Sequence, residues 1–178
     1  MASRSDNLPH RFARIYTAAI TDVMDGLGLP RQTLPWAIRP LTADMRLAGY
    51  AFTARGRPYR GTARDRDATL RLFLKMLGAV PAGSVLVLAA SDNVAAHFGE
   101  LSAAWFRSRR VRGAVIDGST RDAASIARLR FPTFVRYRTP QDSVGRWRVR
   151  DWGQPVTIGG VEAPAGRAPA RNASRRGR

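Results

Sequence analysis

The 178-residue sequence predicts a single-domain, layered α/β fold with a mainly parallel sheet. Short apolar runs alternate with stretches whose apolar residues recur at helical spacing, as in strands joined by crossover helices. The length fits one domain, and a hydrophobic content of 44% with 24% charged residues is typical of a soluble globular protein. We expect residues 1–10 to be a flexible N-terminus, 11–161 to form the domain, and 162–178 to be an Arg-, Ala- and Pro-rich tail that is disordered or aberrant.

The expected elements follow one another along the chain with recognisable start and stop signals. Apolar residues at four-residue intervals predict a first helix over residues 11–27. An i, i+3, i+4, i+7 repeat from Leu70 to Leu77 predicts a second helix, which Asp67 can cap. The unbroken apolar run at 84–90 suits a strand covered on both faces. The other expected elements are strands at 49–54, 114–117, 133–137 and 156–158, helices at about 99–110 and 122–129, loops at 55–66 and 91–98, and a less regular segment at 139–160.

The composition excludes several classes of site and of localisation. The sequence has no cysteine, so any metal must be held by oxygen atoms or by its two histidines, which favours a hard cation. No apolar run approaches the roughly 20 residues that span a bilayer, and residues 1–10 lack the apolar stretch of a signal peptide. We therefore expect a soluble, cytoplasmic protein without a membrane partner.

The formal net charge of +17 raises the question of a nucleic-acid partner. Of the 30 basic residues only Lys75 is lysine, which is more typical of a GC-rich coding bias than of a surface selected for phosphate. Five arginines fall in the aperiodic tail: Arg167, Arg171, Arg175, Arg176 and Arg178. No helix-turn-helix, zinc-finger or aromatic RNA-binding pattern is present, so nucleic acid is not the expected partner.

Two expected strand-to-helix junctions carry residues suited to chemistry. The first is the turn Gly99, Glu100, Leu101 and Ser102, and the second, at 117–122, ends in Arg121 and Asp122. In open α/β sheets ligands bind where strand ends meet helix N-termini, so neighbouring strands would bring both turns to one pocket. Arginine can clamp a carboxylate, and aspartate supplies the oxygen ligand that magnesium or manganese prefers. Together they suit a 2-oxo acid whose keto oxygen a metal polarises, with Glu100 orienting a water or moving a proton.

Plain structural roles remain open for these residues and their neighbours. The Arg121-Asp122 pair and Glu100 also suit first turns of helices, where an acid is favourable. His97 could act as an acid or base, although a surface or packing role is favoured. Asp117 is either a group that supports a metal ligand or a turn residue. The remaining candidates are expected to be solvated, to pack, or to lie in subunit contacts: Asp22, Asp25, Trp105, Trp147 and Trp152.

The stretch GELSAAWFRSRRVRGAVIDGSTRDAASIARLRFPTFVRYRTPQDSVGRWRV resembles the core signature of the RraA-like family, which includes 4-hydroxy-4-methyl-2-oxoglutarate aldolases. The segments TAAITDVMDGLG, LAGYAFTARG and PAGSVLVLAA resemble its N-terminal half, in order, so the similarity runs over about residues 16–161. The resemblance implies a swivelling-type α/β fold, a homotrimer or ring of trimers, and a divalent cation, Mg²⁺ or Mn²⁺. It places the substrate loop on Gly99, Glu100, Leu101 and Ser102, the substrate-binding arginine on Arg121, and the metal-ligating carboxylate on Asp122.

The resemblance therefore predicts a metal-dependent aldolase or decarboxylase, a carbon-carbon lyase. It would act by retro-aldol cleavage of 4-hydroxy-4-methyl-2-oxoglutarate, by decarboxylation of oxaloacetate, or by both. The alternative is an RraA-type regulatory protein that binds and inhibits a ribonuclease without catalysis; a decayed, inactive member is a third interpretation. The presence of both Glu100 and Asp122 favours the lyase, although aldolase members have aspartate at the place of Glu100.

The C-terminal sequence departs from the family pattern. After PVTIGGVEA, members of the family continue with a Pro-Gly-Asp turn, a strand and a closing helix, whereas this chain runs APAGRAPARNASRRGR. This change of composition predicts a frameshifted or truncated terminus.

Overall fold

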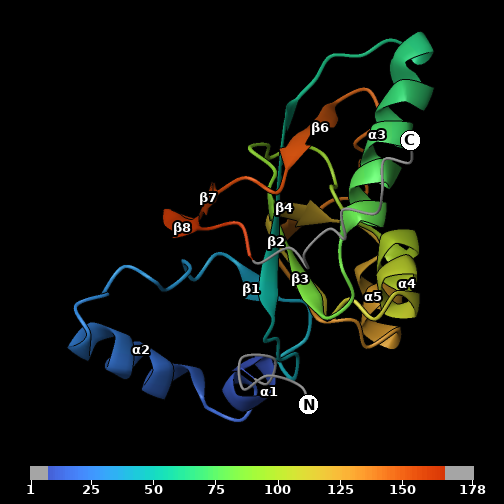
Figure 1. The fold of residues 1–178 in the computed structure, drawn as a ribbon. Helices are drawn as coiled ribbons and strands as arrows, with labels where there is room; N and C mark the ends of the chain where they lie inside the picture. The colour runs from blue at the N-terminus through green and yellow to red at the C-terminus, as the bar shows by residue number, and fades with distance from the viewer. Residues whose placement is uncertain (1–7, 167–178) are drawn as a thin grey trace, which may run out of the picture.

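A six-stranded mixed sheet runs through the middle of the protein, in the order β1-β5-β4-β3-β2-β6 (Figure 1). The computed structural model describes residues 8–166. Strands β2 to β5 are parallel to one another, and the two edge strands β1 and β6 run antiparallel to their neighbours. The sheet comprises β1 (Arg39–Pro40), β2 (Tyr50–Pro58), β3 (Ser84–Ala89), β4 (Gly113–Thr120), β5 (Thr133–Arg138) and β6 (Trp147–Trp152), and β7 (Val156–Ile158) pairs with β8 (Val161–Ala163) as a separate hairpin. The predicted single-domain α/β class is confirmed.

The helices are divided between the body of the protein and an N-terminal arm. The helical segments are α1 (Leu8–Phe12), α2 (Thr17–Gly26), the 3₁₀ turn η2 (Ala63–Asp65), α3 (Arg66–Ala79), α4 (Glu100–Ser108) and α5 (Ala123–Arg128). Helices α3, α4 and α5 cover one face of the sheet, and the β7–β8 hairpin lies on the other face (Figure 1). None of these helices is long and apolar enough to cross a membrane, over the residues that the structure describes.

Strand β3 shows why the core has two sides. Side chains of a strand alternate between its faces. Leu86 and Leu88 belong to the large cluster packed beneath the helices, whereas Val85 and Val87 pack with Ile158 and the rest of the hairpin. The unbroken apolar run thus forms a strand buried on both faces, as predicted.

Pairing that is remote in sequence lengthens one predicted strand and forms another that was not predicted. The segment predicted as a loop from residue 55 is wrong as far as Pro58, because residues 54–58 of β2 pair with β6. Strand β6 itself was missed, because its partner lies about ninety residues earlier and no local pattern marks it. Its first residue, Trp147, is buried, and a Cβ on Gly56 would overlap the indole, so glycine allows the two strands to approach.

The helical predictions differ from the structure mainly at helix starts. Helix α3 begins at Arg66, so the prediction that Asp67 caps it is wrong. The N-cap is Asp65, whose carboxylate instead accepts hydrogen bonds from the backbone N–H (2.8 Å) and the hydroxyl (2.8 Å) of Thr62. Lys75 lies on the exposed side of this helix.

The predicted first helix over 11–27 is wrong as a single element, because the chain breaks between α1 and α2. Helix α2 stands away from the body (Figure 1) and buries none of its residues. The predicted apolar stripe exists, but Ile15, Val23 and Leu27 are 45%, 62% and 70% exposed. Most of this apolar stripe is therefore left uncovered by the described part of its own chain.

Candidate functional site

The β3–α4 loop and the β4–α5 turn meet beyond the carboxyl ends of two adjacent parallel strands. The backbone N–H of Arg121 and the hydroxyl of Thr120 both donate to the carbonyl oxygen of Phe98, at 3.0 and 2.9 Å. Two residues after Phe98, the N–H of Glu100 donates to Oδ2 of Asp122, the residue after Arg121, at 3.2 Å. The two junctions predicted from the sequence thus lie together, in the place where α/β sheets bind ligands.

The backbone and side chain of Asp122 argue against a simple helix-capping role. Its φ and ψ of 57° and 31° lie in the left-handed region, which non-glycine residues seldom adopt and which recurs at functional sites. Its carboxylate makes no capping hydrogen bond to α5 and turns instead toward the start of α4. The side chain therefore points across the junction and does not cap its own helix.

Gly99 permits the close approach of the two turns. A Cβ at this position would lie 2.9 Å from Oδ2 of Asp122 and 3.3 Å from Cγ of Arg121. The backbone of Gly99 is extended, so the requirement for glycine comes from space and not from its own conformation.

A cleft of ≈ 640 Å³ opens beside these turns, between α3, α4 and the segment leading into β6. Every predicted site residue except Glu100 lines it: Gly99, Leu101, Ser102, Arg121 and Asp122. Glu100 is exposed and contributes its backbone N–H to the site, so the predicted proton-transfer role of its side chain stays a prediction. Apolar side chains of α3 and α4 also line the cleft: Leu70, Phe73, Leu74 and Trp105.

Arg121 is held between two carboxylates. Its Nε lies 3.6 Å from Oδ2 of Asp122, and its Nη1 lies 3.8 Å from Oδ2 of Asp142. All three side chains are about two-fifths exposed, so these contacts are weak and leave the guanidinium able to bind an anion.

Asp142 is a site residue that the sequence did not indicate. It falls in a segment without periodicity, and its place is set by non-local contacts of the neighbouring backbone. The N–H of Ala96 donates to the carbonyl of Gln141 at 2.8 Å, and Ala96 forms an isolated bridge with Asp142. Only the fold brings this carboxylate to Arg121.

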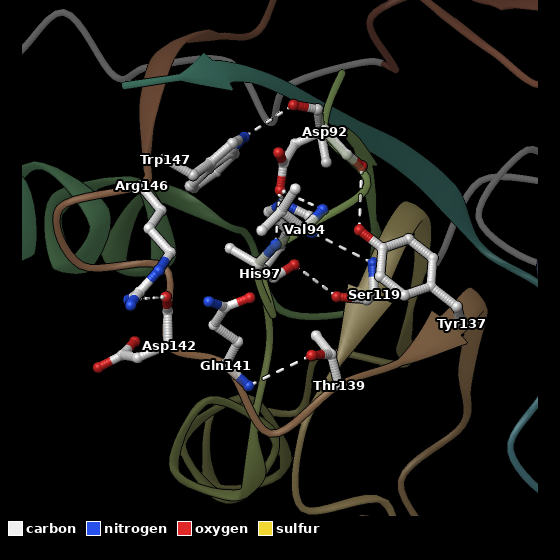
Figure 2. Close-up of polar contacts among 12 residues, drawn as sticks. Asp92, Val94, His97, Ser119, Tyr137, Thr139, Gln141, Asp142, Arg146 and Trp147 are labelled. Atoms are coloured by element: carbon white, nitrogen blue, oxygen red, sulfur yellow. Dashed lines mark hydrogen bonds and ion pairs between the residues drawn. The ribbon is translucent and has the colours of Figure 1, made fainter. Parts of the chain in front are cut away.

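His97 is a packing residue with both ring nitrogens engaged (Figure 2). Its Nδ1 accepts the backbone N–H of Ser119 at 3.1 Å, which requires the neutral tautomer that donates from Nε2 to Oδ2 of Asp92 at 3.0 Å. Burial of the ring lowers the pKa of His97, and the Asp92 carboxylate opposes that shift only in part. An acid-base role for His97 is therefore not supported by its contacts.

Asp117 turns to the opposite face of the sheet from Asp122. It pairs with Nε of Arg136, raising the pKa of that guanidinium, and it accepts the N–H of Gly159 at 2.6 Å. Asp117 therefore ties β4 to β5 and to the β7–β8 hairpin, and it supports no ligand of the cleft.

The other candidates take structural or surface positions. Asp22 and Asp25 are exposed on α2, and Trp105 is 46% exposed beside the guanidinium of Arg109. Trp147 is buried, and Trp152 packs against the edge of the core.

The oxygen donors of this site would suit a hard cation held mostly by water and substrate. The contacts of Asp122 engage Oδ2 and leave Oδ1 without a hydrogen bond or ion pair from residues 8–166. No group of three or more His, Asp or Glu side chains converges within that same range, which does not fit a closed zinc-type site. Magnesium commonly binds through one or two carboxylates and keeps several waters, so Asp122 is a suitable ligand.

Residues 17–168 match the family model of RraA-like proteins, described as Aldolase/RraA, and the chain belongs to this family. Its fold is that of RraA-family proteins. A protein of Halalkalibacterium halodurans named "Putative 4-hydroxy-4-methyl-2-oxoglutarate aldolase" is 28% identical over 155 residues, which cover 85% of this chain. The match spans 66% of that relative's length, just under two thirds.

Two solved structures show the same architecture. Streptomyces coelicolor RraAS2, described as an unusual member of the RNase ES inhibitor RraA protein family, is 26% identical with a TM-score of 0.76, over 90% of this chain and 77% of that one. A structure described as novel cellulases from microbes associated with the gut ecosystem is 29% identical with a TM-score of 0.83, over 93% of this chain and 73% of that one. Proteins similar to this chain are thus described by different functions.

Proposed function

We propose that this protein is a divalent-metal-dependent lyase that cleaves a pyruvate-containing acid. The reaction is retro-aldol cleavage of 4-hydroxy-4-methyl-2-oxoglutarate, decarboxylation of oxaloacetate, or both. The observation that carries the proposal is the convergence of Arg121, Asp122 and the Gly99 turn in one cleft. The similarity to the H. halodurans protein supports the same class of reaction.

Arg121 is proposed to bind a carboxylate of the substrate. A substrate carboxylate can take two parallel hydrogen bonds from the guanidinium, which are stronger than its long contacts with Asp122 and Asp142. The first turn of α4 adds backbone N–H groups, through Leu101 and Ser102, on the same side of the cleft. These groups would fix the acid with its reacting bond near Asp122.

Asp122 is proposed to hold Mg²⁺ or Mn²⁺. When bound, such a cation supplies Lewis-acid polarisation of a keto oxygen. The Glu100 side chain is proposed to orient a water or move a proton at the open edge of the site, and it has one more methylene than the aspartate found in aldolase members.

The competing function is inhibition of a ribonuclease, which the similarity to RraAS2 favours. Pyruvate release is measured from both acids with Mg²⁺, with Mn²⁺ and with EDTA, for the wild type, Asp122→Ala and the matched control Asp67→Ala on α3. The lyase proposal expects metal-dependent turnover that Asp122→Ala abolishes and Asp67→Ala retains. A folded wild type that releases no pyruvate with either metal, yet inhibits a ribonuclease, would establish the regulatory function instead.

We also propose that the protein is a homo-oligomer, a trimer or a ring of trimers, in which α2 of one copy docks on the α3–α4 face of the next. Exposed apolar side chains lie on α2 and on the part of α3 and α4 that lines the cleft. Helix α2 and these two helices lie on opposite sides of the molecule (Figure 1). Residues 15–30 include Asp22 and Asp25 but no Lys or Arg, whereas α3 carries Arg66, Arg71 and Lys75. Pairing of two different surfaces joins copies head to tail and closes into a ring when the rotation allows.

A further inference from the structure

The loop that carries Gly99 is held against the end of β4 by a buried polar network (Figure 2). The network begins at Asp92, whose Oδ2 accepts the N–H groups of Val94 and Ala95 at 3.2 and 2.8 Å. The same oxygen lies 3.0 Å from Nε2 of His97, and both side chains are almost fully buried. The carboxylate thereby fixes both the course of the loop and the tautomer of the imidazole.

His97 then joins this loop to β4 from both its backbone and its ring. Its N–H donates to the carbonyl of Ser119 at 3.1 Å, and its Nδ1 accepts the N–H of Ser119 at 3.1 Å. The pairing of β4 with β5 shifts in register between Ile116 and Ser119. Such an irregularity re-aims backbone groups near functional sites, and here the Ser119 N–H is directed to the imidazole.

The residues around the imidazole of His97 hold the ring in one position. A Cβ on Gly118 would lie 2.6 Å from Nδ1 of His97, so the absence of a side chain there makes room for the imidazole. The indole of Trp147 contacts the ring edge-on, with centroids 4.9 Å apart, and is itself held by a hydrogen bond to the carbonyl of Ala90. The ring is therefore located by steric contacts as well as by its two hydrogen bonds.

The contact between His97 and Ser119 joins two segments that carry the candidate site residues. His97 lies two residues before Gly99, and Ser119 lies two residues before Arg121. We propose that His97 is a positioning residue, whose imidazole sets the separation between the Gly99 turn and the Arg121-Asp122 pair. Its kinetic readout rests on the proposed lyase function, but the geometry that it controls can be measured without turnover.

Two substitutions separate this role from simple filling of space. The carboxamide of asparagine reaches the place of Nδ1 and can accept the Ser119 N–H, whereas that of glutamine reaches the place of Nε2 and can contact only Asp92. His97→Asn therefore retains the contact that the proposal requires, and His97→Gln loses it. His10→Asn, at the exposed histidine of α1, is the control for the change of residue type.

The experiment compares the amide resonances of Gly99, Arg121 and Asp122 by ¹⁵N NMR, together with kcat and KM for pyruvate release. We expect His97→Gln to shift these resonances and to lower kcat/KM by about 10- to 100-fold, as is usual when a group that orients active residues is lost. His97→Asn should restore the resonances and bring kcat/KM to within about threefold of wild type, and His10→Asn should change neither.

The proposal is overturned if folded His97→Asn and His97→Gln proteins lose the same activity, or if both leave the three resonances unmoved. It is also overturned if Nδ1 of His97 carries the proton at neutral pH. A wild type without turnover removes the lyase function but leaves the NMR comparison to decide the role of His97.

Discussion

At the scale of single residues, the absence of a side chain at Gly99 leaves room for the carboxylate of Asp122. Because the nearest atom to an added Cβ is the mobile Oδ2 of Asp122, Gly99→Ala should displace the carboxylate rather than unfold the protein. We expect a fall in kcat/KM of about tenfold or more, since small misplacements of reacting groups are costly.

The matched control is Gly78→Ala on α3, where no atom lies within 4 Å of the added methyl group. That change should leave turnover intact and raise the free energy of unfolding by about 0.5–1 kcal/mol, because alanine is the better helix former. Kinetics and urea denaturation measure both effects. Equal activity in the two variants would contradict the close packing of Gly99 against the site.

The buried imidazole of His97 predicts the pH dependence of stability. Burial lowers the pKa of His97 from the ordinary value of 6.5. Asp92 is the charged group that faces the ring, and the hydroxyl of Tyr137 donates a hydrogen bond to the backbone carbonyl of Asp92. Between that lowered pKa and 6.5 the unfolded chain binds more protons than the native one. The free energy of unfolding should therefore fall as the pH drops below 6.5, and this contribution should level off below the native pKa.

Urea denaturation of the wild type and of His97→Asn at a series of pH values checks this linkage. The difference between the two proteins should change across that window and stay constant above it, because groups remote from the ring titrate alike in both. A difference that stays constant from pH 7.5 to the acid limit of folding would refute the assignment.

At the scale of elements, the sequence predicts those whose signal is local. Strands β3 and β7 lie where the apolar runs placed them, and α4 and α5 begin where the predicted junctions open. Strand β6 and Asp142 were missed because long-range pairing places them, and no periodicity in their own segment reports it. The candidate pair Arg121 and Asp122 was predicted from resemblance and from its position after a strand, but the neutral, engaged state of His97 needed the fold.

The exposed stripe of α2 predicts an assembly with two different surfaces. Val23→Ser on α2 and Leu74→Ser on α3 should each weaken the binding of one copy to the next. Each variant alone should therefore sediment as a smaller species than the wild type. In a head-to-tail interface the Val23→Ser protein keeps an intact α3 surface and the Leu74→Ser protein keeps an intact α2. An equimolar mixture should therefore form dimers in which these two intact surfaces pair. Analytical ultracentrifugation of the mixture tests this directly, and two variants that fail to complement would exclude the pairing of α2 with α3.

At the scale of the whole molecule, we expect the fold not to depend on the proposed metal. Two apolar clusters, one on each face of the sheet, hold the structure together, and among residues 8–166 the cation would bind the protein through little more than Asp122. EDTA should therefore abolish turnover while lowering Tm by less than about 2 °C, unlike a structural metal whose removal unfolds its domain. Thermal unfolding and pyruvate release on the same samples make the comparison, with added Mg²⁺ restoring activity.

The single lysine of the sequence gives the molecule an unusual chemical handle. Lys75 lies exposed on α3, next to Leu74 at the rim of the cleft, among arginines that amine-directed reagents leave untouched. A succinimidyl dye has one side-chain target in this chain, and that target adjoins the face on which a second copy is proposed to dock. The rate of that one acylation therefore becomes a footprint of the interface.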